Sequence, residues 1–295
     1  MENWDGLRVA YQVAKLGTLS AAAEVLGVHH ATVIRQIDAL EAELGVKLFQ
    51  RHARGYTPTE AGQDLLRVAA ATEDQLNQFA VRAAGNSGEI EGDLVVTSLS
   101  GMSPQITPLL VAFQHDNPRI RISLVAQERK LRLEYGEAHV AIRAGARPTE
   151  PDNIVQSLGI LPVTLFAHKD YVARFGPLKG DADLDNHQFV TAISPNSRAP
   201  FQSWFSEHVP PSAIVYCGSD IRSVEDAVHE GAGIGFISLL SGGANPDLVA
   251  MMERRAEWDT EIWMVTHMDL HRSAKVRAFV KFFKPAFQKI LATAT

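Results

Sequence analysis

The sequence predicts an all-α winged helix-turn-helix domain and a long linker helix, followed by an α/β domain of two lobes. Three observations support this fold class. Residues 4–44 hold three apolar-periodic segments separated by glycine, which is typical of small packed helices. Residues 59–84 continue one helical periodicity without a proline. Beyond residue 92, apolar runs of strand length alternate with helical segments, which indicates α/β architecture.

Composition limits the class of protein before any motif is considered. A length of 295 residues with 46% hydrophobic content is sufficient for two packed domains. The net charge of −6, from 28 basic and 34 acidic residues, argues against binding of polyanions over the whole surface. The single cysteine, Cys217, favours a reducing compartment and is expected in the core. Because neither a signal peptide nor a membrane-spanning run is evident, we expect a soluble, cytoplasmic protein.

The second and third predicted helices form the first motif. The segment TLSAAAEVLG starts at the potential caps Thr18 and Ser20 and ends at Gly27, which suits a left-handed turn. A short helix, a tight glycine turn and a second amphipathic helix make a helix-turn-helix, whose second helix enters the DNA major groove. An ordinary amphipathic helix hairpin is the alternative. The expected buried stripe of the third helix is Val33, Ile37, Leu40 and Leu44.

The face opposite that stripe is small, polar and partly basic. Alanines such as Ala31 permit close approach to bases, Thr32 can contact a thymine methyl or a phosphate, and Arg35 can bridge guanine acceptors. Two histidines lie at the helix start, where N–H groups favour phosphate. The predicted DNA-contacting residues of this helix are His29, His30, Ala31, Thr32, Arg35 and Gln36.

A basic hairpin is predicted directly after this helix. The stretch VKLFQRHARGYTPTEAG holds two short strands around a turn, decorated by Lys47, Arg51, His52 and Arg54. Contacts to phosphate need charge and reach more than they need geometry, so Arg51 and Arg54 are predicted DNA-backbone contacts. A basic turn alone is more often simply solvated. Residues 1–62 carry six basic and seven acidic residues, a sum of −1, so any DNA affinity must be local.

The long helix is predicted to start at TPTE, with Thr57 as the cap and Glu60 closing a capping box. At ~1.5 Å per residue, residues 58–84 would extend about 40 Å. Apolar residues recur at steps of four and three, a heptad seam that we expect to pair with a second copy rather than only with its own domain. The predicted dimer contacts are Leu65, Ala69, Thr72, Leu76, Phe79 and Ala83.

The segment AAGNSGEIEGD has the composition of a linker and divides the chain. Beyond it we expect a mostly parallel sheet in each of two lobes, with EIWMVTH as the strand that returns the chain to the first. Two chain crossings create a cleft, which is where ligands bind preferentially. The expected boundaries are 1–62 for the winged helix-turn-helix, 58–84 for the linker helix, 85–92 for a hinge and 93–295 for the α/β domain, with lobe I at about 93–161 and 267–295 and lobe II at about 162–266.

The N-terminal pattern closely resembles one family. The run from Leu7 to Leu66, above all GTLSAAAEVLGVHHATVIRQIDALEAELGVKLFQRHARGYTPTEAG, resembles the winged helix-turn-helix of LysR-type transcriptional regulators. The rest of the chain resembles that family's effector domain through GDLVVTSLSGMSPQITPLLVAFQHDNPRIRISL, AHVAIRAG and VEDAVHEGAGIGFIS. The resemblance implies a dimeric or tetrameric bacterial transcription factor that binds double-stranded DNA. It further implies a periplasmic-binding-protein-like domain that senses a small molecule, with RNA polymerase as a further candidate partner.

The sequence departs from that family pattern in places. The residues HHAT, 29–32, replace the frequent Ser-Gln-Pro-Ala and Ile34 replaces a later serine, which changes the expected base preference but not the docking mode. In the effector domain, His139 replaces a frequent aspartate and Ser238 the usual proline.

The predicted effector site combines the resemblance with local chemistry. The stretch TSLSGMSP passes from a strand to a helix start, where hydroxyl and N–H groups suit a carboxylate. We therefore expect a small metabolite, with an anionic group as one option. Each candidate taken alone is more often a cap or turn residue. The candidates are Ser98, Ser100, Met102, Ser103, Arg143, Asn196, Ser197 and Ser219.

Other chemistry lacks support in the sequence. GAGIGF follows a helix and precedes a strand, the reverse of a phosphate cradle, and HMDLH lacks a third metal ligand. Neither Cys217 nor Ser197 has a base partner in a recognisable motif, so we expect no catalytic residue, no cofactor, no metal and no enzymatic activity. The alternative class is a solute-binding or transferase-type α/β protein without DNA function. A third option is a regulator that has lost its ligand response.

Overall fold

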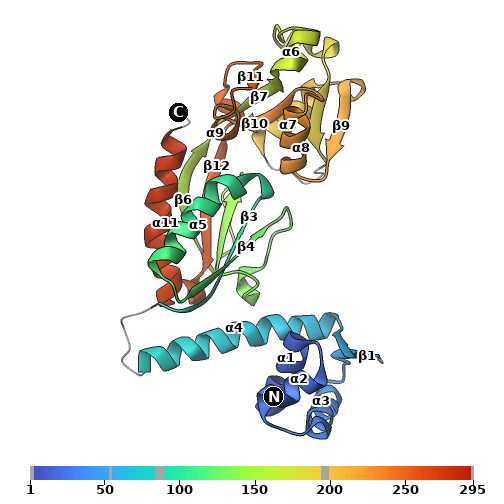
Figure 1. Ribbon diagram of the computed structural model, residues 1–295, viewed down its shortest axis with the longest axis vertical. Coiled ribbons are helices and arrows are strands. Elements are labelled where there is room, and N and C mark those ends of the chain that lie inside the picture. Colours follow the sequence, from blue (N-terminus) through green and yellow to red (C-terminus); the bar gives the residue numbers. More distant parts are fainter. Residues whose placement is uncertain (1–2, 53–54, 84–89, 194–198, 294–295) are drawn as a thin grey trace. The chain divides into compact units, whose positions relative to one another are not determined.

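The structure, a computed structural model, describes residues 3–52, 55–83, 90–193 and 199–293 (Figure 1). The chain divides into two compact units, an N-terminal domain of Met1–Gly88 with Glu134–Glu137 and a C-terminal domain of Glu89–Leu133 with Ala138–Thr295. Among the described helices, none has both the length and the apolar character needed to cross a bilayer.

Lobe I of the C-terminal domain is built on a five-stranded sheet in the order β4-β3-β5-β12-β6. β3 is parallel to β4 and β5, and only β12 runs against both of its neighbours, so the sheet is mostly parallel as predicted. The elements are β3 (Gly92–Ser98), η1 (Ser100–Met102), α5 (Ser103–Asp116), β4 (Ile120–Ala126), β5 (Val140–Ala144), β6 (Asn153–Leu161), β12 (Thr260–His267), α10 (Met268–His271) and α11 (Ala274–Ala292).

Helices α5 and α11 lie side by side over this sheet (Figure 1). Phe279, Phe283 and Phe287 recur every four residues along α11 and are fully buried, with adjacent rings 5.1–5.2 Å apart. Phe113 of α5 meets the ring of Phe279 edge-on at 5.2 Å. Full burial of each aromatic side chain contributes about 1.5–3 kcal/mol. This core also fixes Met102 and Phe287, which line a cavity between the lobes.

Lobe II has two sheets, in the orders β10-β7-β11 and β8-β9, joined by a 2.9 Å hydrogen bond from the N–H of Val190 to the carbonyl of Ile234. The β8-β9 pair is parallel, but β7 runs antiparallel to both β10 and β11, so the mostly parallel sheet expected for this lobe was wrong. Within the described residues β9 is an edge strand that pairs only with β8, and Cys217 on it is exposed, not buried as the sequence suggested. The elements are β7 (Val163–His168), α6 (Lys169–Phe175), η3 (Asp181–Asn186), β8 (Phe189–Ala192), α7 (Pro200–His208), η4 (Pro211–Ala213), β9 (Ile214–Gly218), α8 (Ile221–His229), β10 (Gly235–Ser238), α9 (Leu239–Gly242), β11 (Leu248–Ala250) and η5 (Ala256–Trp258).

The chain crosses between the lobes twice. β6 ends at Leu161 and β7 starts at Val163 in the other lobe, while the return is completed before β12. β12 pairs with β6 from Thr260 to His267 and therefore belongs wholly to lobe I. The expected boundary at 266/267 does not fit this ladder, which starts at Thr260 and includes EIWMVTH, the strand expected to return the chain to lobe I.

The N-terminal domain contains the predicted helix-turn-helix and hairpin. Val33, Ile37 and Leu40 of α3 are fully buried against α1, α2 and the hairpin. Thr18 caps α2 through a 3.3 Å bond from the N–H of Ala21, and Gly27 ends it with a left-handed φ of 65°. The elements are α1 (Trp4–Leu16), α2 (Leu19–Leu26), α3 (His30–Leu44), β1 (Phe49–His52), β2 (Gly55–Pro58) and α4 (Glu60–Ala83).

The start of the long helix differs from the prediction. Thr57 lies in β2, and Thr59 caps α4 instead by accepting a 3.1 Å hydrogen bond from the N–H of Gly62. The first turn of α4 lies tightly on the hairpin, because a Cβ at Gly62 would stand 2.0 Å from the carbonyl oxygen of Leu48. The segment TPTE therefore does start a helix, but the cap is Thr59 and not Thr57, because Thr57 pairs with Gln50 in the hairpin.

A buried carboxylate joins α3 to the hairpin. Glu41 is 3% exposed, and its Oε1 accepts hydrogen bonds from the N–H groups of Leu48 at 2.9 Å and Phe49 at 3.3 Å. Its Oε2 accepts from Lys47 at 2.7 Å and Arg51 at 3.2 Å. Burial opposes ionisation, but the hydrogen bonds from Lys47 and the two backbone groups outweigh it and lower the pKa of the carboxyl. Glu41 thus takes the inward place on α3 that the sequence assigned to Leu44, which is exposed.

Glu41→Gln should destabilise the N-terminal domain by about 1.5–3 kcal/mol, because a neutral amide cannot satisfy the same four donors. A lowered pKa in the fold means that this stabilisation is present above the ordinary glutamate pKa and is lost as the pH falls through the folded value. Denaturant unfolding of the full chain at several pH values measures both effects. Glu43→Gln, on the exposed side of α3, serves as the control. Equal stability of Glu41→Gln and Glu43→Gln at neutral pH would contradict the stabilising role of the Glu41 carboxylate.

Candidate nucleic-acid interface and ligand cavity

The outer face of α3 is uncovered within the N-terminal domain. Ala31, Arg35, Asp38 and Ala39 are exposed and Thr32 is half-buried, opposite the stripe that packs on α1 and α2. The N–H of Thr32 bonds back to the carbonyl of His29 at 2.8 Å, and the side chain of His29 caps no backbone group of α3. The helix therefore presents an exposed surface that starts at a terminus favourable for an anion.

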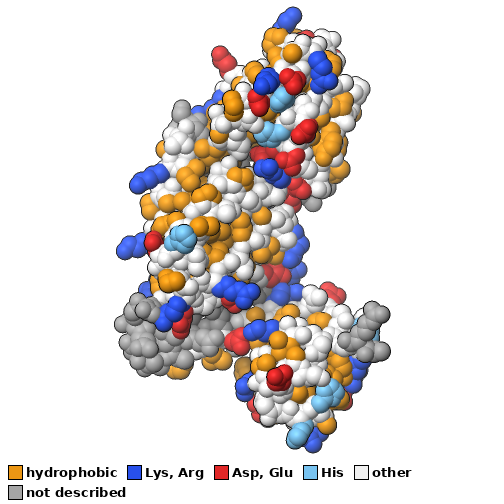
Figure 2. All heavy atoms as spheres, viewed as in Figure 1, with side chains coloured by type: hydrophobic (Ala, Val, Ile, Leu, Met, Phe, Trp, Pro, Cys, Tyr) orange, Lys and Arg blue, Asp and Glu red, His pale blue; other side chains and the backbone are white. Residues whose placement is uncertain are grey.

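Gln36 lies at the edge of this face. It is half-buried, and its buried Oε1 has no hydrogen-bond partner in the described part of the chain. Figure 2 shows blue, red and pale-blue side chains interspersed on the N-terminal domain in this view, not one continuous basic surface.

Two basic side chains of the hairpin, Lys47 and Arg51, form ion pairs with α3. Arg51 pairs with Asp38 and lies 3.2 Å from Glu41, while Lys47 pairs with Glu41. These pairs brace the hairpin against the third helix. The predicted contact of Arg51 with the DNA backbone stays a prediction, and Arg54 lies outside the described residues.

The apolar seam of α4 is divided along its length. Leu65 packs partly against the core of its own domain, whereas Leu76 and Phe79 are 62% and 61% exposed. On another side of α4, Glu73 accepts hydrogen bonds from Tyr11 at 2.7 Å and Lys15 at 3.2 Å, which tie the helix to α1. Ala69 and Thr72 are half-buried, and the side chain of Ala83 lies outside the described set. The seam thus leaves two large apolar side chains without cover in the single chain.

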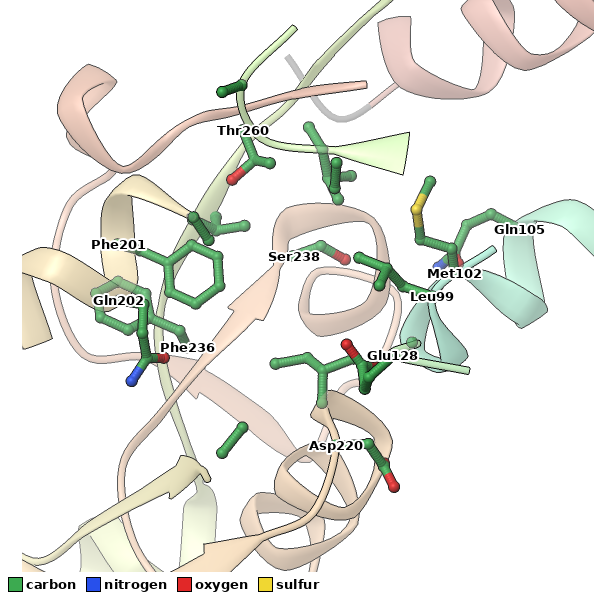
Figure 3. A pocket seen from close by; sticks show the side chains of 18 of the residues that line it. Leu99, Met102, Gln105, Glu128, Phe201, Gln202, Asp220, Phe236, Ser238 and Thr260 are labelled. Carbon is green, nitrogen blue, oxygen red and sulfur yellow. The ribbon is translucent and has the colours of Figure 1, made fainter. Parts of the chain in front are cut away.

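The C-terminal domain encloses a cavity of about 480 Å³ between its lobes. In Figure 3, Phe201, Gln202 and Phe236 of lobe II stand on one wall, and Leu99, Met102 and Gln105 of lobe I face them. The lobes touch beside it, where Gln105 donates a 3.0 Å hydrogen bond to Ser241 and a Cβ at Gly101 would stand 2.4 Å from Ile221. The volume and the mostly apolar walls suit a small organic molecule.

The structure brings only some predicted effector residues to this cavity. Met102 and Ser219 line it. Ser98 and Ser103 are not lining residues, and Ser100 instead donates a 3.1 Å hydrogen bond to Glu128 at the rim. Arg143 lies on the other face of the sheet, where its guanidinium donates to the carbonyl of Leu131 at 3.2 Å. Asn196 and Ser197 fall outside the described residues.

Glu225 is the lining residue that sequence analysis missed most clearly. It is 4% exposed on α8, and burial raises the pKa of its carboxyl to about 7, with Arg222 acting to lower it and Asp226 to raise it. A signal was available: Glu225 follows Ile221 by four residues and so falls in the apolar stripe of its helix. Thr260, also a lining residue, carried no such signal because its place depends on strand pairing between β12 and β6.

These two sites define a class of protein: a DNA-binding regulator with an effector-binding domain. Residues 4–63 match the bacterial regulatory helix-turn-helix protein, lysR family, and residues 87–288 match the LysR substrate binding domain. The chain belongs to the LysR family of bacterial transcriptional regulators.

Relatives and solved structures agree with this assignment. An HTH-type transcriptional regulator of Xanthomonas campestris pv. campestris is 28% identical, over 92% of this chain and 81% of its own. An HTH-type transcriptional repressor of Pseudomonas aeruginosa is 25% identical, and the match covers 97% of this chain and 93% of the repressor. In fold, the chain is similar to full-length OxyR from Pseudomonas aeruginosa, with a TM-score of 0.68, 16% identity and 96% of each chain covered. Full-length CbnR in complex with its target DNA is similar with a TM-score of 0.60 and 22% identity, and the match covers 100% of each chain.

The pH dependence of stability should report on Glu225. A carboxyl whose pKa rises from 4.5 to about 7 on folding contributes fully below 4.5, and that contribution is lost as the pH rises to about 7. Relative to Glu225→Gln, the wild-type chain should therefore lose up to about 3 kcal/mol across this interval. Thermal unfolding of both proteins at a series of pH values measures the difference. Glu230→Gln, at an exposed position at the end of α8, should follow the pH profile of the wild-type chain. Parallel pH profiles for wild type and Glu225→Gln would contradict the assignment.

Proposed function

We propose that this chain regulates transcription by binding two operator half-sites as a dimer or tetramer, under the control of a small molecule bound between the lobes of its C-terminal domain. The observation that carries the proposal is the uncovered outer face of α3 with Arg35 exposed on it. A recognition helix must be fixed on one side and free on the other. CbnR, whose fold this chain shares, forms a complex with its target DNA, and that complex supports a DNA-binding role here.

The proposed oligomer rests on α4. Two large apolar side chains exposed on one face of a 24-residue helix are costly in a monomer and suit a helix–helix seam. A C2 dimer would present two copies of α3 to two half-sites, and a tetramer would double that arrangement. RNA polymerase is a further proposed partner, and the place of action is the bacterial cytoplasm, where the DNA is.

The proposed effector site is the interlobe cavity. Its lining comes from both lobes, so a ligand that fits only one arrangement of the lobes biases that arrangement. The relatives are named as regulators, which supports a role in binding instead of catalysis. A solute-binding or transferase role without DNA binding does not account for the helix-turn-helix.

Introducing charge into the seam tests the oligomer. Leu76→Glu combined with Phe79→Glu should shift the full chain to a smaller species in analytical ultracentrifugation, because four carboxylates would meet across a dimer seam. Gln63→Glu places a charge on the opposite face of α4, where the side chain is exposed, and should leave the mass unchanged. An unchanged mass for the double variant would place the interface elsewhere.

Removing Arg35 tests the DNA-binding role. On genomic fragments selected by the wild-type chain, Arg35→Ala should weaken specific binding by about 1–3 kcal/mol, because an arginine bidentate to guanine accounts for that much discrimination. Binding is measured by fluorescence anisotropy against matched and scrambled duplexes. Arg8→Ala removes an exposed cation from α1 and should leave the preference for the selected sequence intact. Selected fragments that bind Arg35→Ala and wild type with equal affinity would remove Arg35 from the base-contacting set.

A further inference from the structure

The ligand cavity contains a buried carboxyl that the fold leaves without a complete set of partners. Within the described residues, Glu225 accepts no hydrogen bond, and its nearest cation is Nη1 of Arg222, 3.7 Å from Oε2. Arg222 is itself shared, since its Nη2 lies 3.1 Å from Asp226. A buried ionised group is costly unless it is paired and hydrogen-bonded. Glu225 therefore has binding capacity that remains open on the side of the cavity.

A second polar group in the cavity wall is also unsatisfied. Thr260 is 3% exposed, and its Oγ1 has no hydrogen-bond partner among the described residues. Figure 3 shows this side chain on the wall near Phe201, at the start of the strand that returns the chain to lobe I. Buried polar atoms without partners are rare and call for a ligand or a water. A hydroxyl can accept a hydrogen bond as well as donate one.

The charges around the cavity are unevenly distributed. Among the described lining residues, the only cations are Lys130 and Arg147, and both are exposed. Arg147 lies over the ring of Trp263, 5.7 Å from its centroid. The acidic lining residues are Glu128, Glu150, Asp220 and Glu225, of which only Glu225 is buried. The inner part of the described lining therefore offers a carboxyl and no cation, the opposite of what an anionic metabolite requires.

The remaining lining suits an apolar body next to a positive charge. Phe201 and Phe236 form an aromatic wall with ring centroids 5.0 Å apart. Aromatic faces pack on rings and alkyl chains, and they attract cations through the π-system.

We propose that the effector is a small primary amine with an aromatic or branched apolar body, whose ammonium group binds Glu225 while the body packs on Phe201 and Phe236. This inference rests on the proposed function of the cavity as the effector site. It replaces the anionic group considered from the sequence with a cationic one.

Matched probes that differ only in the polar group test the charge. Benzylamine, 2-phenylethylamine and 3-phenylpropylamine are titrated calorimetrically into the full chain, each beside its alcohol and carboxylate counterpart. At about pH 8, above the pKa of about 7 to which burial raises Glu225, most of this carboxyl is ionised, and alkylamines keep their proton. The best amine should bind at least about tenfold more tightly than its alcohol, the scale expected for a charge-assisted hydrogen bond, and more tightly than its carboxylate.

Two variants assign the effect to the cavity. Glu225→Gln keeps the shape of the side chain and should reduce the amine affinity by about tenfold or more while leaving the alcohol affinity unchanged. Glu230→Gln removes the same charge from an exposed position at the end of α8 and should retain amine binding. An amine affinity that does not fall in Glu225→Gln overturns the proposal, as does preferred binding of the carboxylates.

The test separates this inference from the function on which it rests. Tight binding of a carboxylate with release or capture of operator DNA would support the effector function and overturn the amine. Failure of all nine probes, in a preparation that binds its operator, would likewise overturn the amine inference and leave DNA binding established. Amine binding sensitive to Glu225→Gln, in a chain that binds no DNA, would support the inference and contradict the regulatory role.

Discussion

The attachment of α3 to its domain from one side only is the constraint on which the rest of the structure depends. Three buried aliphatic side chains and the Glu41 carboxylate fix this helix, and they all lie toward α1, α2 and the hairpin. The other side remains exposed and carries small and polar residues. A surface that binds DNA has to be rigid without being covered. Flexible groups would have to be ordered on binding, and the entropy lost in ordering them would weaken the affinity. The packing of the N-terminal domain meets both conditions.

Two buried glutamates show how the same sequence feature leads to different outcomes. Glu41 follows Ile37 by four residues and Glu225 follows Ile221 by four, so both stand in apolar stripes. Glu41 accepts hydrogen bonds from four donors, which keep it ionised and make it part of the fold. Glu225 accepts none from the described residues and its pKa rises to about 7. The completeness of the hydrogen bonds distinguishes a structural carboxylate from one available to a ligand.

The fold was largely predictable because it follows local periodicity. The helix-turn-helix, the hairpin, the long helix and the alternation of strands and helices all depend on residues a few positions apart. Errors arose where distant segments decide the outcome. Leu44 was predicted to face inward because the periodicity of the helix does not show that Glu41 has hydrogen-bond partners in the hairpin. The second segment of lobe I was predicted to begin too late in the chain, because the pairing of β12 with β6, about a hundred residues earlier, decides where it begins. The cavity was harder still to predict, since Thr260 and Glu225 line it only through the packing of both lobes. The serine-rich stretch near residue 100 looked suitable by composition alone.

A structure of the full chain bound to a duplex selected from its own genome measures the central claim most directly. The account predicts that α3 lies in the major groove with Ala31, Thr32 and Arg35 against base edges, while Val33 and Ile37 remain packed in the domain. An α3 whose exposed side is buried against protein, with the duplex bound by another surface, would contradict it.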